Sequence, residues 1–173
     1  MVGMDGGELK SVLREAFEAR VMNHGDYSLV YGQPSGPGPV LVLGYRRTSL
    51  ELLLCPVDLA DLGAIAEGTA RPAGRVTSID LTNVATVADT GTGYQVETVT
   101  GFRAWFEVEG TARIPVADAA GGPAAGTVLM DQEDAAEDFH QFMGHFMDTL
   151  DAFYQVPDVA EILQGAYMTA LAA

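Results

Sequence analysis

Several kinds of residue are scarce in this chain of 173 residues, and each scarcity excludes something. Cys55 is the only cysteine, so no disulfide can form within the chain, which fits a reducing compartment. Nine lysines and arginines face 24 acidic residues, for a formal net charge of −15. A surface of this charge repels nucleic acid and anionic membranes. Its acids are either simply solvated, as a compositional bias would leave them, or they serve a basic protein partner.

Long hydrophobic runs and targeting segments are also missing. No apolar run approaches the roughly 20 residues that cross a bilayer. The opening segment MVGMDGGELK has neither the basic residues nor the apolar core of a signal peptide. We therefore expect a cytoplasmic protein that binds no membrane and no nucleic acid. Its length suits a single domain over residues 1–173, with a core that needs no disulfide.

The most regular stretch of the sequence is 131–155, which we predict to be one long amphipathic helix. Asp131 can cap its start, and Pro157 ends the run because proline removes a backbone donor. Large apolar residues gather on one face of this helix. They are Phe139, Phe142, Met143, Phe146, Met147, Leu150 and Phe153.

Other helices and strands follow from shorter patterns. Asp5 and Glu8 form a capping-box pattern at the start of a predicted helix over 5–23. The glycine- and proline-rich stretch 32–39 predicts a loop. Apolar alternation and continuous apolar runs predict strands. These are 27–31, 40–45, 50–57, 75–82, 94–100, 102–109 and 112–116. Two further helices are predicted, over 58–67 and from 158 to about 171.

Together these elements predict an α+β fold. An antiparallel sheet of five to seven strands is packed by the N-terminal helix and two C-terminal amphipathic helices. The stretch 118–126, DAAGGPAAG, predicts a flexible linker. It would set the C-terminal helices apart as a helical hairpin over 131–172.

No catalytic motif stands out, and we expect no catalytic residue, metal or cofactor. Glu137 precedes His140 by three residues, the spacing that carboxylate-bridged metal sites use, but such sites need several copies of the motif. His140 and His145 lie about 140° apart around the helix, so they would not share one ion. The residues that would line a ligand pocket are Arg46, Arg47, Trp105, His140 and His145.

The apolar face of 131–155 has two interpretations. Phenylalanine and methionine at helical spacing usually belong to a core. A small sheet would leave part of two amphipathic helices uncovered, so the same seven residues are also a predicted interface for self-association.

Two resemblances bear on function. ELKSVLREAF at 8–17, the strands of 27–57 and DFHQFMGHFM at 138–147 resemble, in their order and acidity, the small acidic secretion chaperones and their YbjN-like relatives. This resemblance implies a non-enzymatic dimer that holds a client segment. Residues 77–108 are similar in rhythm to a PH/GRAM-like β-barrel, with the 131–155 helix in the place of its closing helix, which implies a scaffold or lipid module.

From the sequence we expect a non-catalytic acidic protein, adaptor or chaperone-like, that binds a protein partner and acts as a homodimer. The first alternative is an enzyme or small-molecule binder with a pocket between the sheet and the 131–155 helix. The second is a structural component of a larger assembly.

Overall fold

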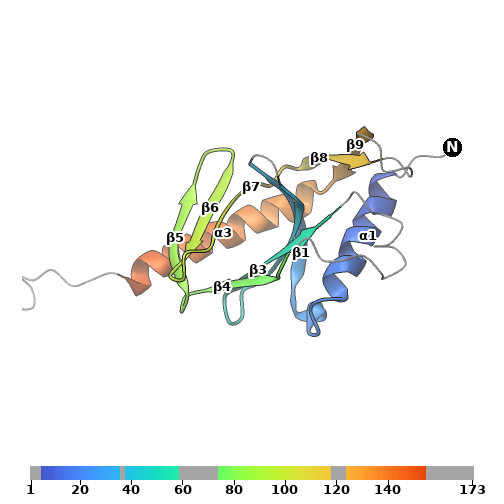
Figure 1. The fold of residues 1–173 in the computed structure, drawn as a ribbon. Coiled ribbons are helices and arrows are strands. Elements are labelled where there is room, and N and C mark those ends of the chain that lie inside the picture. The colour runs from blue at the N-terminus through green and yellow to red at the C-terminus, as the bar shows by residue number, and fades with distance from the viewer. Residues whose placement is uncertain (1–4, 36–37, 59–73, 118–123, 155–173) are drawn as a thin grey trace, which may run out of the picture.

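A seven-stranded antiparallel sheet is the centre of the fold, in the strand order β4-β3-β2-β1-β7-β6-β5 (Figure 1). The computed structural model describes residues 5–35, 38–58, 74–117 and 124–154. The elements are α1 (Gly6–Glu18), a 3-10 turn (His24–Asp26), β1 (Ser28–Pro34), β2 (Val40–Arg46), β3 (Glu51–Val57), β4 (Thr77–Asp80), β5 (Val84–Asp89), β6 (Gly93–Thr98), β7 (Arg103–Glu107), β8 (Thr111–Ala117), β9 (Ala124–Asp131) and α3 (Glu133–Phe153). The predicted α+β class, with its antiparallel sheet and N-terminal helix, is confirmed.

The sheet consists of two meanders that meet at β1. We call β1 to β4 the first half and β5 to β7 the second half. β4 and β5 lie at opposite edges of the sheet, although only residues 81–83 separate them in the chain. Asn83 holds this corner, because its side chain accepts from the amide of Asp80 and donates to the carbonyl of Ser78. The sheet therefore curves strongly, and its concave face surrounds α3 (Figure 1).

The β2–β3 hairpin confirms the predicted pair of strands, with Val40 opposite Val57 at the open end. Every residue of β2 up to Tyr45 is buried. Such continuous burial requires cover on both faces of the strand. The tip carries Arg46 and Arg47, and Ser49 takes a left-handed backbone conformation with φ 55°.

β1 changes partners along its length, and this corrects the predicted loop. We expected residues 32–39 to be irregular, but Gly32 to Pro34 continue the strand. Residues 28–32 pair with β2, whereas Gln33 and Pro34 pair with Glu107 and Phe106 of β7. Proline is tolerated here because it lies at the end of a strand, where few ladder hydrogen bonds are lost.

The inner core lies between α3 and the concave face of the sheet. Phe139 is fully buried, and its ring contacts Tyr45 of β2 at 5.3 Å, Tyr94 of β6 at 5.8 Å and Phe106 of β7 at 6.3 Å between centroids. One side chain of α3 therefore touches both halves of the sheet.

The outer face of the first half is covered by α1 and the β8–β9 hairpin. The capping box of α1 is confirmed, with Glu8 donating its amide to Asp5 at 2.8 Å and returning its carboxylate to the Asp5 amide at 3.1 Å. The ring of Phe17 lies where a side chain at Gly44 would be, 2.6 Å from the position of an added Cβ. Glycine in β2 thus lets α1 approach the sheet closely.

Several predicted boundaries and elements need correction. The long helix begins at Glu133, and its N-cap is Gln132, whose side chain makes no capping bond. Residues 124–126 of the predicted linker belong to β9, which pairs with β8. The second C-terminal helix, from 158 to about 171, and the short helix over 58–67 lie outside the described residues apart from Asp58. Among the helices that the structure describes, none is both long and apolar enough to cross a membrane.

Candidate functional site

His140 lies at the point where α3 passes β6 and the segment after β7. Its Nδ1 lies 2.6 Å from the Tyr94 hydroxyl, and its Nε2 lies 3.2 Å from the Val108 carbonyl. A carbonyl can only accept, so Nε2 carries a proton and donates to Val108, and we assign Nδ1 as the acceptor of the Tyr94 hydroxyl. The Tyr94 ring also lies 5.7 Å from the imidazole, between centroids. β6 and the segment after β7 therefore hold this ring in one orientation.

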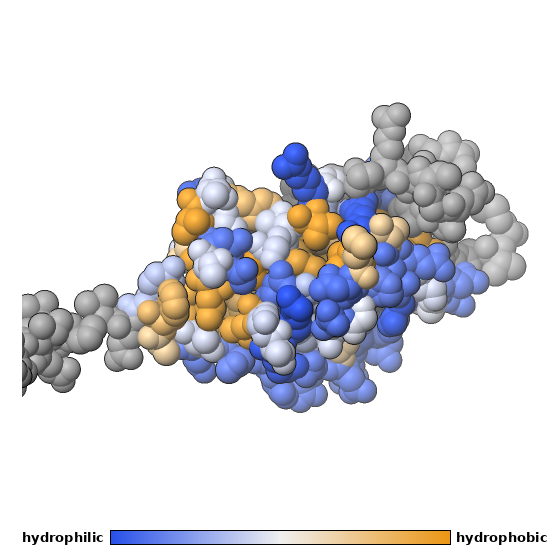
Figure 2. All heavy atoms as spheres, turned by 90° about the horizontal axis from the view of Figure 1, so that it is seen from below, coloured by the Kyte–Doolittle hydropathy of each residue, from blue (hydrophilic) through white to orange (hydrophobic). Residues whose placement is uncertain are grey.

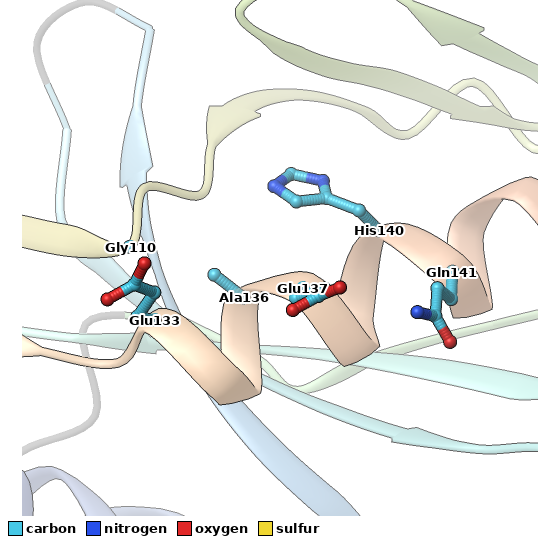
Figure 3. A pocket seen from close by; sticks show the side chains of 6 residues that line it. All are labelled: Gly110, Glu133, Ala136, Glu137, His140 and Gln141. Atoms are coloured by element: carbon cyan, nitrogen blue, oxygen red, sulfur yellow. The ribbon is translucent and has the colours of Figure 1, made fainter.

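A shallow cleft of about 550 Å³ opens on one side of His140 (Figure 3). Its other lining residues are Gly110, Glu133, Ala136, Glu137 and Gln141. In Figure 3 the ring of His140 projects from α3 toward the strands, while Glu133, Glu137 and Gln141 lie along the helix. Residues four apart on a helix share a face, so the two carboxylates stand in one row.

A second cleft, of about 440 Å³, opens on the other side of the same ring. It lies between α3 and the β5–β6 turn, and Gly144 leaves it room because an added Cβ there meets nothing within 4 Å. Its lining residues are Asp89, Gly91, Thr92, Gly93, Tyr94, Val108, His140, Gly144 and Met147. His140 lines both clefts, which follow one another along α3, and we call the two clefts together the α3 groove.

The α3 groove is electrically negative. Glu133 and Glu137 line its first cleft and Asp89 its second, and the described lining residues include no lysine or arginine. Burial, and secondly the negative charge of Asp89, raises the pKa of Tyr94 to about 12. Tyr94 is therefore neutral at physiological pH, which keeps its hydroxyl available as the donor to His140.

The predicted ligand residues do not converge on the α3 groove. Arg47 donates to Asp138 of α3 at 2.9 Å, and Arg46 pairs with Glu51 at 3.0 Å. Arg47 and the Tyr45 hydroxyl together lower the pKa of Asp138, with the bond from Arg47 the larger cause. Both arginines line a separate cleft at the hairpin tip. Among the three clefts described, it is the one cleft that two of the predicted ligand residues line together.

Trp105 and His145 lie elsewhere. Trp105 is on the outer face of β7, opposite Gln95 of β6, and 44% of its side chain is exposed. No helix of the described chain covers it. His145 is exposed on α3. Cys55 is fully buried beside Arg20, and burial raises the pKa of its thiol, so it stays protonated.

The apolar face of α3 is chiefly core. Five of the seven residues of the predicted interface are buried in the subunit, and Met147 is half-buried. Phe153, at the end of the helix, is 62% exposed. Self-association through α3 stays a prediction, but in the described structure its apolar face is already occupied by the sheet.

Two residues that matter for the site escaped the sequence analysis. Gln132 is buried, and its side-chain amide bonds both the amide and the carbonyl of Tyr31 at 2.9 Å and the carbonyl of Glu109 at 2.8 Å. It thus occupies the edge of β1 where β7 does not pair, and it fixes the start of α3 beside the first cleft. Tyr94 lies in the predicted strand 94–100, and no sequence signal joins it to His140.

Within the described ranges, no three histidine, cysteine or acidic side chains are grouped so that they could hold a metal ion.

Comparisons of the chain with protein-family models, with curated proteins and with solved structures each find no match. The α3 groove must therefore be interpreted from its own geometry and charge.

Proposed function

We propose that this chain is a non-catalytic, acidic protein that binds a basic segment of a partner protein in the α3 groove, as an adaptor or chaperone would. The observation that carries the proposal is the pair of clefts that share His140, with carboxylates at both ends. An extended segment suits a long, shallow groove better than a small compact ligand does. Cytoplasmic location is part of the same proposal.

The charge of the groove sets the class of partner. Glu133 and Glu137 form one negative subsite and Asp89 forms the other, and a partner with spaced lysines or arginines would meet both. Between them the walls are small or neutral, at Gly93 and Gly144. Exposed ion pairs contribute little each, so we expect modest affinity that weakens with salt.

The test is binding of a fluorescein-labelled peptide with spaced lysines, measured by anisotropy at low and high salt. Glu133→Gln with Glu137→Gln removes two charges from the groove. We expect roughly a fivefold loss of affinity for two exposed pairs. The matched control, Asp148→Asn with Asp151→Asn, removes two exposed charges from the same helix outside both clefts.

A steric variant separates the groove from general electrostatics. Gly144→Leu places a side chain into the second cleft, where an added Cβ has open space, and it leaves the net charge unchanged. We expect it to weaken peptide binding while the folded chain keeps its thermal stability. Equal binding by all variants, or by a glutamate-rich peptide, would remove the proposal.

Homodimer formation also belongs to the proposal. Because α3 is occupied within the subunit, the better-placed surface is the outer face of β7 around Trp105, which the described chain leaves open. Light scattering at micromolar concentration measures the mass. A shift of the Trp105 emission on dilution would place the contact at this face, and a monomer at all concentrations would exclude the dimer.

The alternative, a small-molecule binder or enzyme, is favoured by one observation. The His140–Tyr94 pair stands at the wall of the second cleft, where a ligand could take over the hydroxyl bond. Thermal-shift screening against metabolites tests this alternative, and Tyr94→Phe should abolish any hit that uses the pair.

A further inference from the structure

A hydrophobic patch surrounds the end of α3. Val99, at the end of β6, is 63% exposed, and Phe153 and Tyr154 close the helix with exposed rings. The two rings pack edge to face with centroids 5.2 Å apart. We call Val99, Phe153 and Tyr154 the α3-end patch. An exposed cluster of this kind on a small domain marks a surface that another segment contacts.

Two hydrogen bonds place Val99 and Tyr154 at one corner of the molecule, and Phe153 packs on Tyr154 there. The Tyr154 hydroxyl lies 3.5 Å from the carbonyl of Val84, at the start of β5. The amide of Val99 donates at 2.8 Å to the carbonyl of Asn83, which precedes Val84 in the chain. Figure 2 shows hydrophobic residues gathered on the face near the end of α3. The patch therefore spans α3 and the open corner between the two edges of the sheet.

The sequence offers an occupant that is attached to the patch. Residues 158–171, outside the described range, follow Tyr154 after a link of three residues, which spans about 10 Å when extended. Their predicted helix would be about 21 Å long. Its apolar stripe consists of Val159, Ile162, Leu163, Ala166, Tyr167 and Ala170.

We propose that residues 158–171 dock with this apolar stripe on the α3-end patch of their own chain. The segment carries Asp158 and Glu161 and no basic residue, so it cannot be drawn to an acidic protein by charge. Apolar contact is what both surfaces offer. The short link holds the stripe near the patch at a high effective concentration, which favours the same chain over a second copy.

Cross-linking of the full-length protein tests the location and the copy together. Val99→Cys with Leu163→Cys is treated with a short bis-maleimide, and Cys55 does not interfere because it is fully buried. We expect an internally linked monomer on a denaturing gel. The control pairs Leu163→Cys with Met22→Cys, a fully exposed residue just beyond α1, and it should link poorly. Linked dimers would assign the patch to a second copy, and equal linking in both pairs would remove the proposal.

Dye binding tests whether the stripe covers the patch. Ile162→Asp with Leu163→Asp should raise the fluorescence of 8-anilinonaphthalene-1-sulfonate several-fold, because the patch becomes open to the dye. Gln164→Asp with Met168→Asp adds the same charge to the opposite face of the predicted helix and should leave the signal unchanged. If both pairs act alike, or neither acts, the stripe does not cover the patch. Lysine-peptide binding should be the same in both pairs, so this test is independent of the α3 groove.

Discussion

The two halves of the sheet differ in how the rest of the chain covers them. The first half, β1 to β4, is packed on its inner face by α3 and on its outer face by α1 and the β8–β9 hairpin. The second half, β5 to β7, has α3 inside, while no element of the described chain covers its outer face. The difference separates a scaffold from a surface: the first half fixes the fold, and the second half borders the α3 groove and the α3-end patch.

The largest expected effect comes from the residue that touches both halves. Phe139→Ala removes a fully buried ring that contacts β2, β6 and β7. We expect it to lower the free energy of unfolding by about 3–5 kcal/mol, from lost transfer energy and the cavity left behind. Urea denaturation measures the change. Phe102→Ala, at a partly exposed phenylalanine beside β7, is the control and should cost clearly less.

Gln132→Leu tests the junction between the two halves of the sheet, where Gln132 bonds Tyr31 of β1 and Glu109 after β7. The substitution keeps the bulk but leaves the amide and carbonyl of Tyr31 and the carbonyl of Glu109 without this partner. We expect a loss of about 1–3 kcal/mol in the free energy of unfolding, because buried backbone groups would lack hydrogen bonds. Hydrogen exchange at Tyr31 should accelerate. An unchanged exchange rate there would mean that the Tyr31 amide stays protected without the glutamine.

Tyr94→Phe tests the inner side of the second half, and its effect depends on pH. The folded pKa of about 12 lies above the ordinary value of about 10, so the folded chain keeps a proton that the unfolded chain releases between them. This stability is fully present below about pH 10 and is lost as the pH rises through about 12. Tyr45, Tyr27 and Tyr31 have raised pKa values as well and contribute in the same direction.

Near neutral pH we expect Tyr94→Phe to cost about 1 kcal/mol, since His140 loses its hydroxyl donor. At alkaline pH the variant should lose stability less steeply than the parent chain. Denaturation midpoints from neutral pH to about pH 11 measure both slopes. Parallel slopes would show that Tyr94 titrates alike in the folded and unfolded chains.

The smallest effect is expected on the open face. Trp105→Thr exchanges an exposed aromatic residue for another good strand former, so stability should change by no more than about 0.5 kcal/mol. Thermal denaturation at low protein concentration measures it. A larger loss that grows with protein concentration would show that this face is buried between copies.

Local patterns predicted much of this fold. The capping box of α1, the apolar β2–β3 pair and the stripe of α3 each lie within a few turns or residues of sequence, where periodicity is informative. These features depend on neighbours in the chain, and the structure has them close to their predicted bounds.

Features that depend on distant partners were missed. Nothing near Pro34 shows that β1 will change from β2 to β7, and nothing near Gln132 shows that its amide will bond a strand 101 residues away. The β8–β9 hairpin was hidden because its second strand begins inside a stretch of alanine and glycine. For the same reason the pairing of His140 with Tyr94 could be found in space but not in sequence.

The position of α3 in the chain has a consequence for biosynthesis. Each meander pairs strands that are neighbours in sequence, so both can form early as the chain leaves the ribosome. The helix that packs against both meanders, α3, is synthesised last among the described elements, because it starts at Glu133. Until then the nascent chain exposes a concave apolar lining to solvent, so we expect it to bind holding chaperones and to aggregate when translation stalls before that point.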